Sequence, residues 1–151
     1  MDIPIFNLST LKKYFYNFIA TSIMITAISI GVYFWISTRN IRLPFESINS
    51  MYVIGSIFVG TYIFNQLSKK ELNRIIETVD YQEKFRKYEH RYKKQLIVNV
   101  ISIVFSGFFL ITTQKRLMLY LIICQLVLSL LFYPKKIVIE RELKDDKIIY
   151  T

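Results

Sequence analysis

Charged residues are absent from four long stretches of this sequence. No Asp, Glu, Lys, Arg or His occurs in residues 14–38, 47–68, 95–114 or 117–134. Proton relays, voltage sensors and most ion-coupled transporters place ionisable groups in their membrane segments, because a moving charge needs a titrating or pairing partner there. We therefore expect neither coupled transport nor intramembrane proteolysis, since acid–base chemistry needs titratable side chains.

Cysteine and histidine are nearly absent as well. The chain has one cysteine, Cys124, and one histidine, His90. A single cysteine cannot form an intrachain disulfide, and one Cys with one His cannot complete a zinc site. His90 follows Arg86 by four residues, a closer spacing than in HEPN ribonucleases, so a nuclease is not expected. The sequence predicts a protein that is not an enzyme and that binds no cofactor or metal.

The four uncharged stretches are strongly apolar. Their lengths of 25, 22, 20 and 18 residues are close to the roughly 20 residues that a helix needs to cross about 30 Å of hydrocarbon. The first stretch is too long for the apolar core of a cleaved signal peptide. We predict an all-α, polytopic membrane protein that forms one domain over residues 1–151. It has four transmembrane helices, a cytoplasmic helical stalk at 69–94 and a cytoplasmic tail at 135–151.

Lysine and arginine are distributed unequally between the two sides of the predicted bundle. With both termini in the cytoplasm, 16 of the 20 Lys and Arg residues lie inside, and the four outside are Arg39, Arg42, Lys115 and Arg116. Positive residues in short loops are retained in the cytoplasm, so an N-in, C-in orientation is predicted. The 25 isoleucines against two alanines indicate an AT-rich coding sequence, and we expect the bacterial inner membrane as the location.

The predicted stalk contains two sets of apolar residues at helical spacing, one on each side of residues 78–80. Between them, Asp80 and Glu83 form a D-x-x-E arrangement that can cap a new helix. We therefore expect two helices that turn near residues 78–80 and pack against each other. One continuous helix lying on the membrane is the alternative, because the turn has no glycine.

The second half of the stalk combines basic and aromatic side chains. Its members are Arg86, Lys87, Tyr88, Arg91, Tyr92, Lys93 and Lys94. Anionic lipid headgroups or an acidic cytosolic protein would bind such a face, whereas binding to nucleic acid is not expected. The simpler interpretation is a solvated helix face whose charges only keep the loop inside.

The tail after Pro134 has apolar residues at alternate positions, among them Ile137 and Ile139. Alternation followed by the polar pair Asp145-Asp146 is typical of a short β-hairpin, which would need a partner to pair with. We therefore predict that Ile137 and Ile139 contact a partner. A frayed tail, or a short helix over Glu140 to Lys147, is the alternative.

Uncharged polar side chains recur at helical spacing within three of the predicted spans. They are Ser22, Thr26 and Ser29, then Asn99, Ser102 and Ser106, and finally Gln125 and Ser129. These stripes either hold the helices of one bundle together or converge from several subunits to line a pore. We favour packing, with Asn99 or a second copy of Gln125 as the partner of Gln125.

Small side chains form a separate set, which we expect to allow close packing between helices. They are Ala20, Ala27 and Gly31 in the first span and Ser56 and Gly60 in the second.

These observations favour a non-catalytic scaffold or sensor that is homo-oligomeric and holds a cytosolic partner at the membrane. A homo-oligomeric pore or membrane-disrupting effector is the alternative. In layout alone, four short spans with a basic middle loop, the chain resembles small inner-membrane subunits of bacterial phage-defence and phage-exclusion systems. It is also similar to toxin-immunity membrane proteins. The resemblance covers size and hydropathy without a shared motif, so it implies a biological context and assigns no residue a role.

Overall fold

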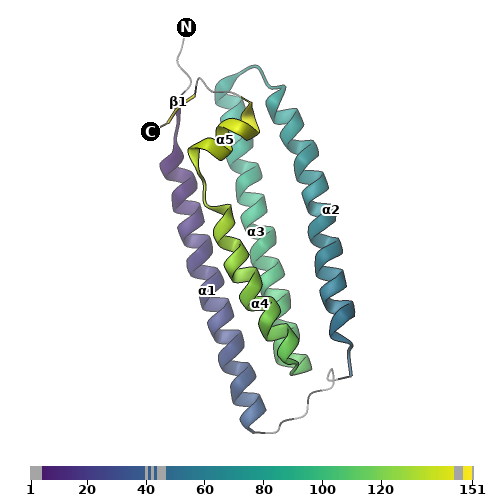
Figure 1. The fold of residues 1–151 in the computed structure, drawn as a ribbon. Coiled ribbons are helices and arrows are strands. Elements are labelled where there is room, and N and C mark those ends of the chain that lie inside the picture. Colours follow the sequence, from purple (N-terminus) through teal and green to yellow (C-terminus); the bar gives the residue numbers. More distant parts are fainter. Residues whose placement is uncertain (1–4, 40, 42, 44–46, 145–147, 151) are drawn as a thin grey trace.

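The computed structural model describes residues 5–39, 41, 43, 47–144 and 148–150. In chain order its elements are β1 (Ile5–Phe6), α1 (Leu8–Thr38), α2 (Ser50–Ile76), α3 (Tyr81–Thr113), α4 (Arg116–Ser129), the 3₁₀ turn η1 (Leu130–Phe132), α5 (Lys136–Leu143) and β2 (Ile149–Tyr150). The fold is therefore helical, as predicted. Helices α1 to α4 run alternately up and down in one bundle, and both termini lie at the same end (Figure 1). We call this the terminal end and the opposite one the loop end.

Two helices in the described part of the chain, α1 and α3, are long and apolar enough to cross a membrane. Four spans were predicted, so the structure supports two of them by this measure. Helix α2 has 27 residues, but Ser56, Thr61, Asn65 and Gln66 make it less apolar. Helix α4 has only 14 residues, and it gives a third candidate only when the bent pair Arg116–Phe132 and Lys136–Leu143 is counted as one span. An uncharged stretch is not necessarily apolar enough to span a membrane, and α2 is less apolar than its lack of charge suggested.

The ends of the helices follow from local capping. Asn7, Asn49 and Asp80 precede α1, α2 and α3, and the side chain of each accepts a hydrogen bond from a backbone N–H of the first turn. The chain turns between Ile76 and Tyr81, as predicted, so the continuous helix is wrong. At the other end of α3, Gln114 adopts a left-handed conformation with φ 53° and its backbone N–H bonds to Leu110 O, which ends the helix and lets α4 fold back.

The predicted C-terminal β-hairpin is wrong. Residues 136–143 form α5, which is bent by 76° from α4 because Pro134 holds Tyr133 in an extended conformation with ψ 125°. Ile139 and Leu143 are spaced i and i+4, and both are 1% exposed against the bundle, so helical burial outweighs the alternation. The short-helix alternative started four residues too late, and its residues 145–147 lie outside the described residues.

The segment β2 pairs in parallel with β1, with Ile5 opposite Ile149 and Phe6 opposite Tyr150. The tail thus pairs with the N-terminal segment of its own chain. Arg42, which was counted among the outer charges, also lies outside the described residues.

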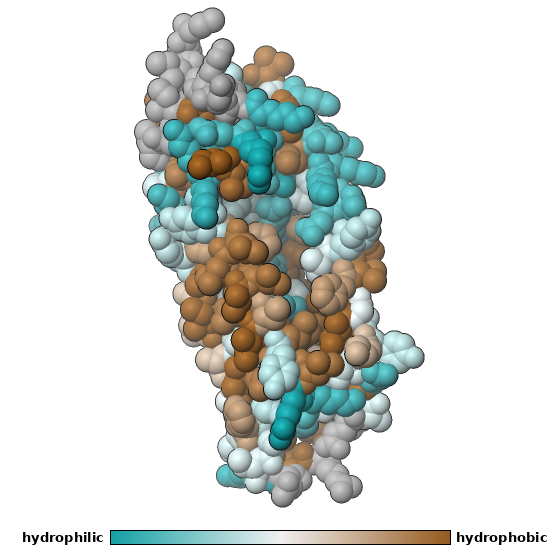
Figure 2. All heavy atoms as spheres, viewed as in Figure 1, coloured by the Kyte–Doolittle hydropathy of each residue, from teal (hydrophilic) through white to brown (hydrophobic). Residues whose placement is uncertain are grey.

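The interior of the bundle has two apolar clusters. The terminal cluster packs Phe6, Phe15, Tyr88 and Ile139 together with neighbouring residues, and the loop cluster is centred on residues such as Leu110. On the surface, Figure 2 shows apolar side chains over the middle of the bundle and polar ones gathered at the terminal end. Exposed apolar side chains occur on each of the helices α1 to α4. This distribution is the one expected for a bundle surrounded by lipid.

Candidate functional site

A basic groove lies between α2 and α3 at the terminal end, and we take it as the candidate functional site. Its volume is about 430 Å³, and it is lined by Glu71, Arg74, Ile75, Arg86, Lys87 and His90. Four of the six lining residues are basic types. Ile75 is only 2% exposed and contributes an apolar surface beneath the charged side chains.

The turn between α2 and α3 brings these side chains together. Asp80 Oδ1 accepts a hydrogen bond from the backbone N–H of Gln82 at 3.1 Å, which fixes the start of α3. Glu83, the second member of the predicted capping pair, instead contacts Lys87 at 2.9 Å. Two antiparallel helices joined by so short a turn place residue 74 of α2 beside residues 86 and 87 of α3.

The charges of the groove are only partly balanced within the chain. Lys87 is paired with Glu83, and Glu71 is paired with Lys94 at 2.8 Å. Within the described residues, the side chains of Arg74, Arg86 and His90 have no hydrogen bond or ion pair to a protein group. Like charges that converge from two helices repel one another, so the groove presents net positive charge to an anionic group.

A buried polar network lies next to this groove, and we call it the latch. Arg91 is 5% exposed, and its Nη1 donates to Glu142 Oε2 of α5 at 3.0 Å. Its Nε donates to Ser68 Oγ of α2 at 3.0 Å, and Tyr88 donates to the same Glu142 oxygen at 2.8 Å. Three helices are therefore joined through one guanidinium, whose fork geometry suits several acceptors at once.

Burial, together with the neighbouring carboxylate of Glu142, raises the pKa of Tyr88 above its usual value. The Tyr88 hydroxyl therefore keeps its proton at physiological pH and remains a donor. It lies beyond the apolar part of α3.

The residues predicted to bind a partner or lipid fall into two groups. Tyr88, Arg91, Tyr92 and Ile139 are buried in the bundle, so in this conformation they cannot contact a partner. Their polar atoms are used inside the chain; Tyr92, for example, donates to Phe132 O at 2.8 Å. For these four residues we correct the prediction.

The other predicted binding residues remain accessible, and their contact with a partner or lipid stays a prediction. Arg86, Lys87 and Lys94 are exposed, Lys93 is half-buried, and Ile137 is 76% exposed. The Lys93 ammonium lies 4.1 Å from the ring centroid of Tyr14, so it also stabilises the contact between α3 and α1.

The predicted polar stripes face one another inside the bundle and form what we call the polar belt. Asn99 donates to Ser129 Oγ at 2.9 Å, and Gln125 donates to Ser102 Oγ at 3.0 Å. The expected pairing of Gln125 with Asn99 is therefore wrong. Gln125 bonds to Ser102, one turn along α3 from Asn99, and Asn99 bonds to Ser129, one turn along α4 from Gln125. Ser29 lies in the belt as well, buried against Gly107 of α3.

Not every polar atom in the belt has a partner. Within the described residues, four buried side-chain atoms have none: Ser22 Oγ, Thr26 Oγ1, Ser106 Oγ and Gln125 Oε1.

The predicted small-residue surface is not used within the chain, since Ala20, Ala27, Gly31, Ser56 and Gly60 are all exposed. The close approach occurs elsewhere, at Gly107 of α3. A Cβ at this position would lie 2.3 Å from Ser29 Oγ and 3.1 Å from Ser29 Cβ. Sequence reasoning missed this contact, although Gly107 is the only glycine in its predicted span.

Sequence reasoning missed Arg74 as a member of the groove, and it considered His90 beside Arg86 only as a nuclease pair. The predicted turn could have revealed Arg74. Two antiparallel helices that turn at residues 78–80 place residue 74 beside residues 86 and 87. Within the described residues, no group of three or more His, Cys, Asp or Glu could hold a metal ion. No protein-family model, curated protein or solved structure matches the chain. Any function must therefore be argued from the chemistry of the site.

Proposed function

We propose that this protein is a non-catalytic membrane scaffold that holds an acidic cytosolic partner in the basic groove. The observation that carries the proposal is the convergence of Arg74, Arg86 and His90 on one groove without an anionic partner within the described residues. An acidic segment would relieve the repulsion between Arg74 and Arg86 and form charge-assisted hydrogen bonds with their guanidinium groups. Val79, at 92% exposed, lies in the adjoining turn and adds an apolar contact for the same partner.

We further propose that four helices cross the bilayer. Helices α1 and α3 run in the same direction in the bundle (Figure 1). If both cross, the chain between them must return through the same thickness, and α2 is the segment that returns. At 1.5 Å per residue, the uncharged part of α2, residues 50–68, extends about 28 Å, which is close to the roughly 30 Å hydrocarbon core.

The orientation in this proposal remains N-in, C-in. The terminal end carries the groove, the latch and most of the Lys and Arg residues, so it is assigned to the cytoplasm by the retention of positive charge. The outward small-residue face of α1, which includes Ala27 and Gly31, is proposed as the contact of a homo-oligomer. The bacterial inner membrane and a role in phage defence or toxin immunity remain proposals of context.

Reversing charge in the groove tests the scaffold proposal. The tagged full-length protein is recovered from its host in mild detergent, and the proteins bound to it are quantified by mass spectrometry. We expect Arg74→Glu/Arg86→Glu to lose a stoichiometric companion. Lys13→Glu/Arg141→Glu should keep it, because it changes the net charge equally at exposed positions outside the groove. Equal recovery with both double variants would contradict the proposal.

The pore alternative receives less support from the arrangement of the polar stripes. The residues that would line a shared pore, among them Ser106 and Ser129, are buried within a single chain. Gln125→Leu/Ser129→Ala tests this alternative directly in vesicles that contain the purified protein. A pore predicts ion leakage that the double variant suppresses; a scaffold predicts no protein-dependent leakage in either form.

A further inference from the structure

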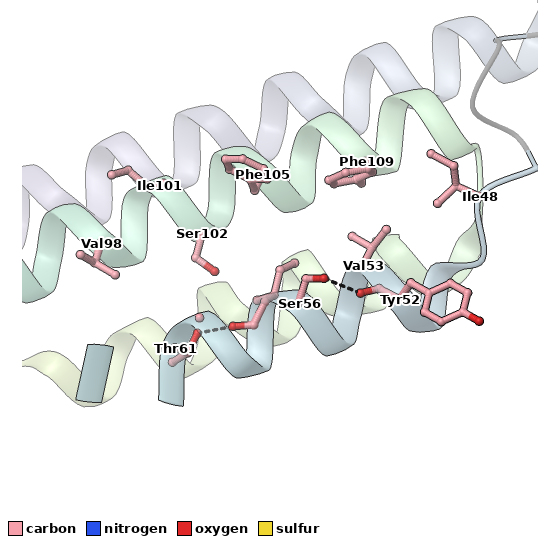
Figure 3. A pocket seen from close by; sticks show the side chains of 12 residues that line it. Ile48, Tyr52, Val53, Ser56, Thr61, Val98, Ile101, Ser102, Phe105 and Phe109 are labelled. Atoms are coloured by element: carbon pink, nitrogen blue, oxygen red, sulfur yellow. Dashed lines mark hydrogen bonds between the residues drawn. The ribbon is translucent and has the colours of Figure 1, made fainter. Parts of the chain in front are cut away.

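A second groove, lined by apolar residues, lies between α2 and α3 nearer the loop end. Its volume is about 570 Å³, and Figure 3 shows Val53 and Ser56 of α2 facing Ser102, Phe105 and Phe109 of α3 across it. Gly60 lines it too, and a Cβ at Gly60 would meet nothing within 4 Å. The space between the two helices is thus left open by small side chains on α2.

The serine and threonine hydroxyls of this groove are already bonded within the chain. Ser56 Oγ donates to Tyr52 O at 2.8 Å, and Thr61 Oγ1 donates to Ile57 O at 2.8 Å. Ser102 Oγ accepts from Gln125. A ligand would therefore find largely apolar walls in which Ser56 and Thr61 of α2 have already used their hydroxyl donors, so its buried part must be apolar.

The length of the groove fits one leaflet of a bilayer. The lining residues run from Tyr52 to Thr61 on α2 and from Phe109 to Val98 on α3, which is about 14–16 Å at 1.5 Å per residue. Half of the hydrocarbon core is roughly 15 Å thick. A helix 10–12 Å wide would occupy roughly 1,500 Å³ over that length, far more than the groove holds, whereas an extended acyl chain is much narrower.

A cationic group stands at the mouth of the groove. Lys115 donates from its Nζ to the carbonyl oxygen of Ile48, and Ile48 lines the groove. An ammonium has three N–H donors, so two remain for a phosphate oxygen at the depth of the lipid headgroups.

We propose that this groove is a binding site for one acyl chain of an anionic phospholipid, with its phosphate at Lys115. The inference rests on the proposed membrane arrangement of α2 and α3. The bound lipid fills the space that Gly60 and Ser56 leave and holds α2, which has few buried residues, against the rest of the bundle.

Photolabelling in vesicles tests the site. The full-length protein is reconstituted with phosphatidylglycerol that carries a diazirine in its acyl chain, irradiated, digested and mapped by mass spectrometry. We expect several-fold more adducts on the groove residues than on Phe58, Val59 and Ile63, which are exposed on other faces of α2. Equal labelling of both sets would overturn the proposal, since it would indicate ordinary contact with bulk lipid.

Matched variants separate the site from general effects. Gly60→Leu and Ser56→Leu each fill the groove and should remove most of its adducts. Gly55→Leu is the control, because Gly55 has equally open surroundings on α2 but does not line the groove. Unchanged groove labelling in both filled variants would contradict the proposal. Lys115→Gln should lower labelling by the phosphatidylglycerol probe and leave labelling by a phosphatidylcholine probe unchanged.

Two further outcomes are distinguishable. A Ser56→Cys/Cys124→Ser variant that forms a disulfide-linked dimer in vesicles would show that a second copy covers the groove, and the lipid proposal would be wrong. If the probes label neither the groove nor the outward faces of α1 and α3, the membrane arrangement itself is wrong and the lipid site is wrong with it. Loss of groove labelling alone leaves the scaffold proposal intact.

Discussion

The latch and the polar belt are both polar clusters inside the bundle, but they satisfy their hydrogen bonds to different extents. In the latch, Arg91 bonds to two helices, and Glu142 accepts from both Arg91 and Tyr88. In the belt, two amide-to-hydroxyl pairs coexist with four buried atoms that lack a partner within the described residues. The latch contains charge near the bundle end, whereas the belt contains only neutral groups at its middle.

This difference follows from the free-energy cost of a buried polar group without a partner, which is larger for a charged group than for a neutral one. A buried charge without a partner costs several kcal/mol, so a charged cluster persists only when it is fully paired. A neutral hydroxyl without a partner, such as Ser22 Oγ or Ser106 Oγ, costs only about 1–3 kcal/mol. We therefore expect changes in the latch to have larger effects on stability than changes in the belt.

The largest effect is expected for Arg91→Ala. Removing the guanidinium leaves Tyr88 as the donor to Glu142 and Gln95 as the donor to Ser68 Oγ. The carboxylate loses its charged partner, so we expect a loss of about 3 kcal/mol. Thermal unfolding in detergent measures the loss, and trypsin cleavage within α5 measures release of the tail. Arg91→Lys should recover only part of the stability, because a single ammonium cannot copy the guanidinium fork. A melting temperature equal to that of the wild type would show that the latch holds nothing together.

Gly107→Ala should rank second, with a loss of about 2 kcal/mol from overpacking, because its Cβ would lie 2.3 Å from Ser29 Oγ. Gly55→Ala is the matched control and should be neutral or slightly stabilising, since alanine is the better helix former and nothing lies within 4 Å of a Cβ there. Gly107→Ala/Ser29→Ala should recover part of the loss. The same loss in the double variant would place the strain elsewhere.

Glu142→Gln should cost about 1 kcal/mol, because the amide oxygen still accepts a hydrogen bond but the attraction to Arg91 is lost. Glu140→Gln is the control; Glu140 contacts the well-exposed Lys136 at 3.7 Å, and such a pair contributes little. The two variants are compared by chemical denaturation at low and high salt. An equal loss in both would mean that the position of the charge is irrelevant.

Gln125→Leu should have the smallest effect, within about 0.6 kcal/mol. The substitution removes one hydrogen bond to Ser102 but also removes an unpartnered oxygen. The unfolding free energy in SDS provides the measurement. A loss as large as that of Arg91→Ala would reverse the ranking of the two clusters.

The sequence predicted local features of this fold better than distant contacts. Asp80 indicated the start of α3, and helical spacing placed Ser22, Ser106 and Ser129 on inward faces, because both follow from residues close together in the chain. Contacts across the chain were missed. Arg91 and Glu142 are 51 positions apart, and no periodicity links α5 to the bundle end. The alternation of Ile137 and Ile139 predicted a strand. The segment is a helix instead, because helical spacing buries Ile139 and Leu143 together against the bundle.

The groove was predicted in part, for a similar reason. Arg86 and Lys87 stood out because they belong to one basic run, but Arg74 lies on the other helix and joins them only through the register of the turn. Tyr88 and Arg91 stood out in the same run, yet they point inward. Composition shows that a helix is basic; only its packing shows which side of the helix is available.

The pairing of Ile5 with Ile149 and of Phe6 with Tyr150 also limits how the chain is threaded through a bilayer. Two segments that hydrogen-bond to each other lie on the same side of a bilayer, so the proposed arrangement must cross it an even number of times. Three spans are inconsistent with this pairing. Reporters fused to either end must therefore report the same compartment. A split fluorescent protein divided between the two termini would be brought together by the fold itself.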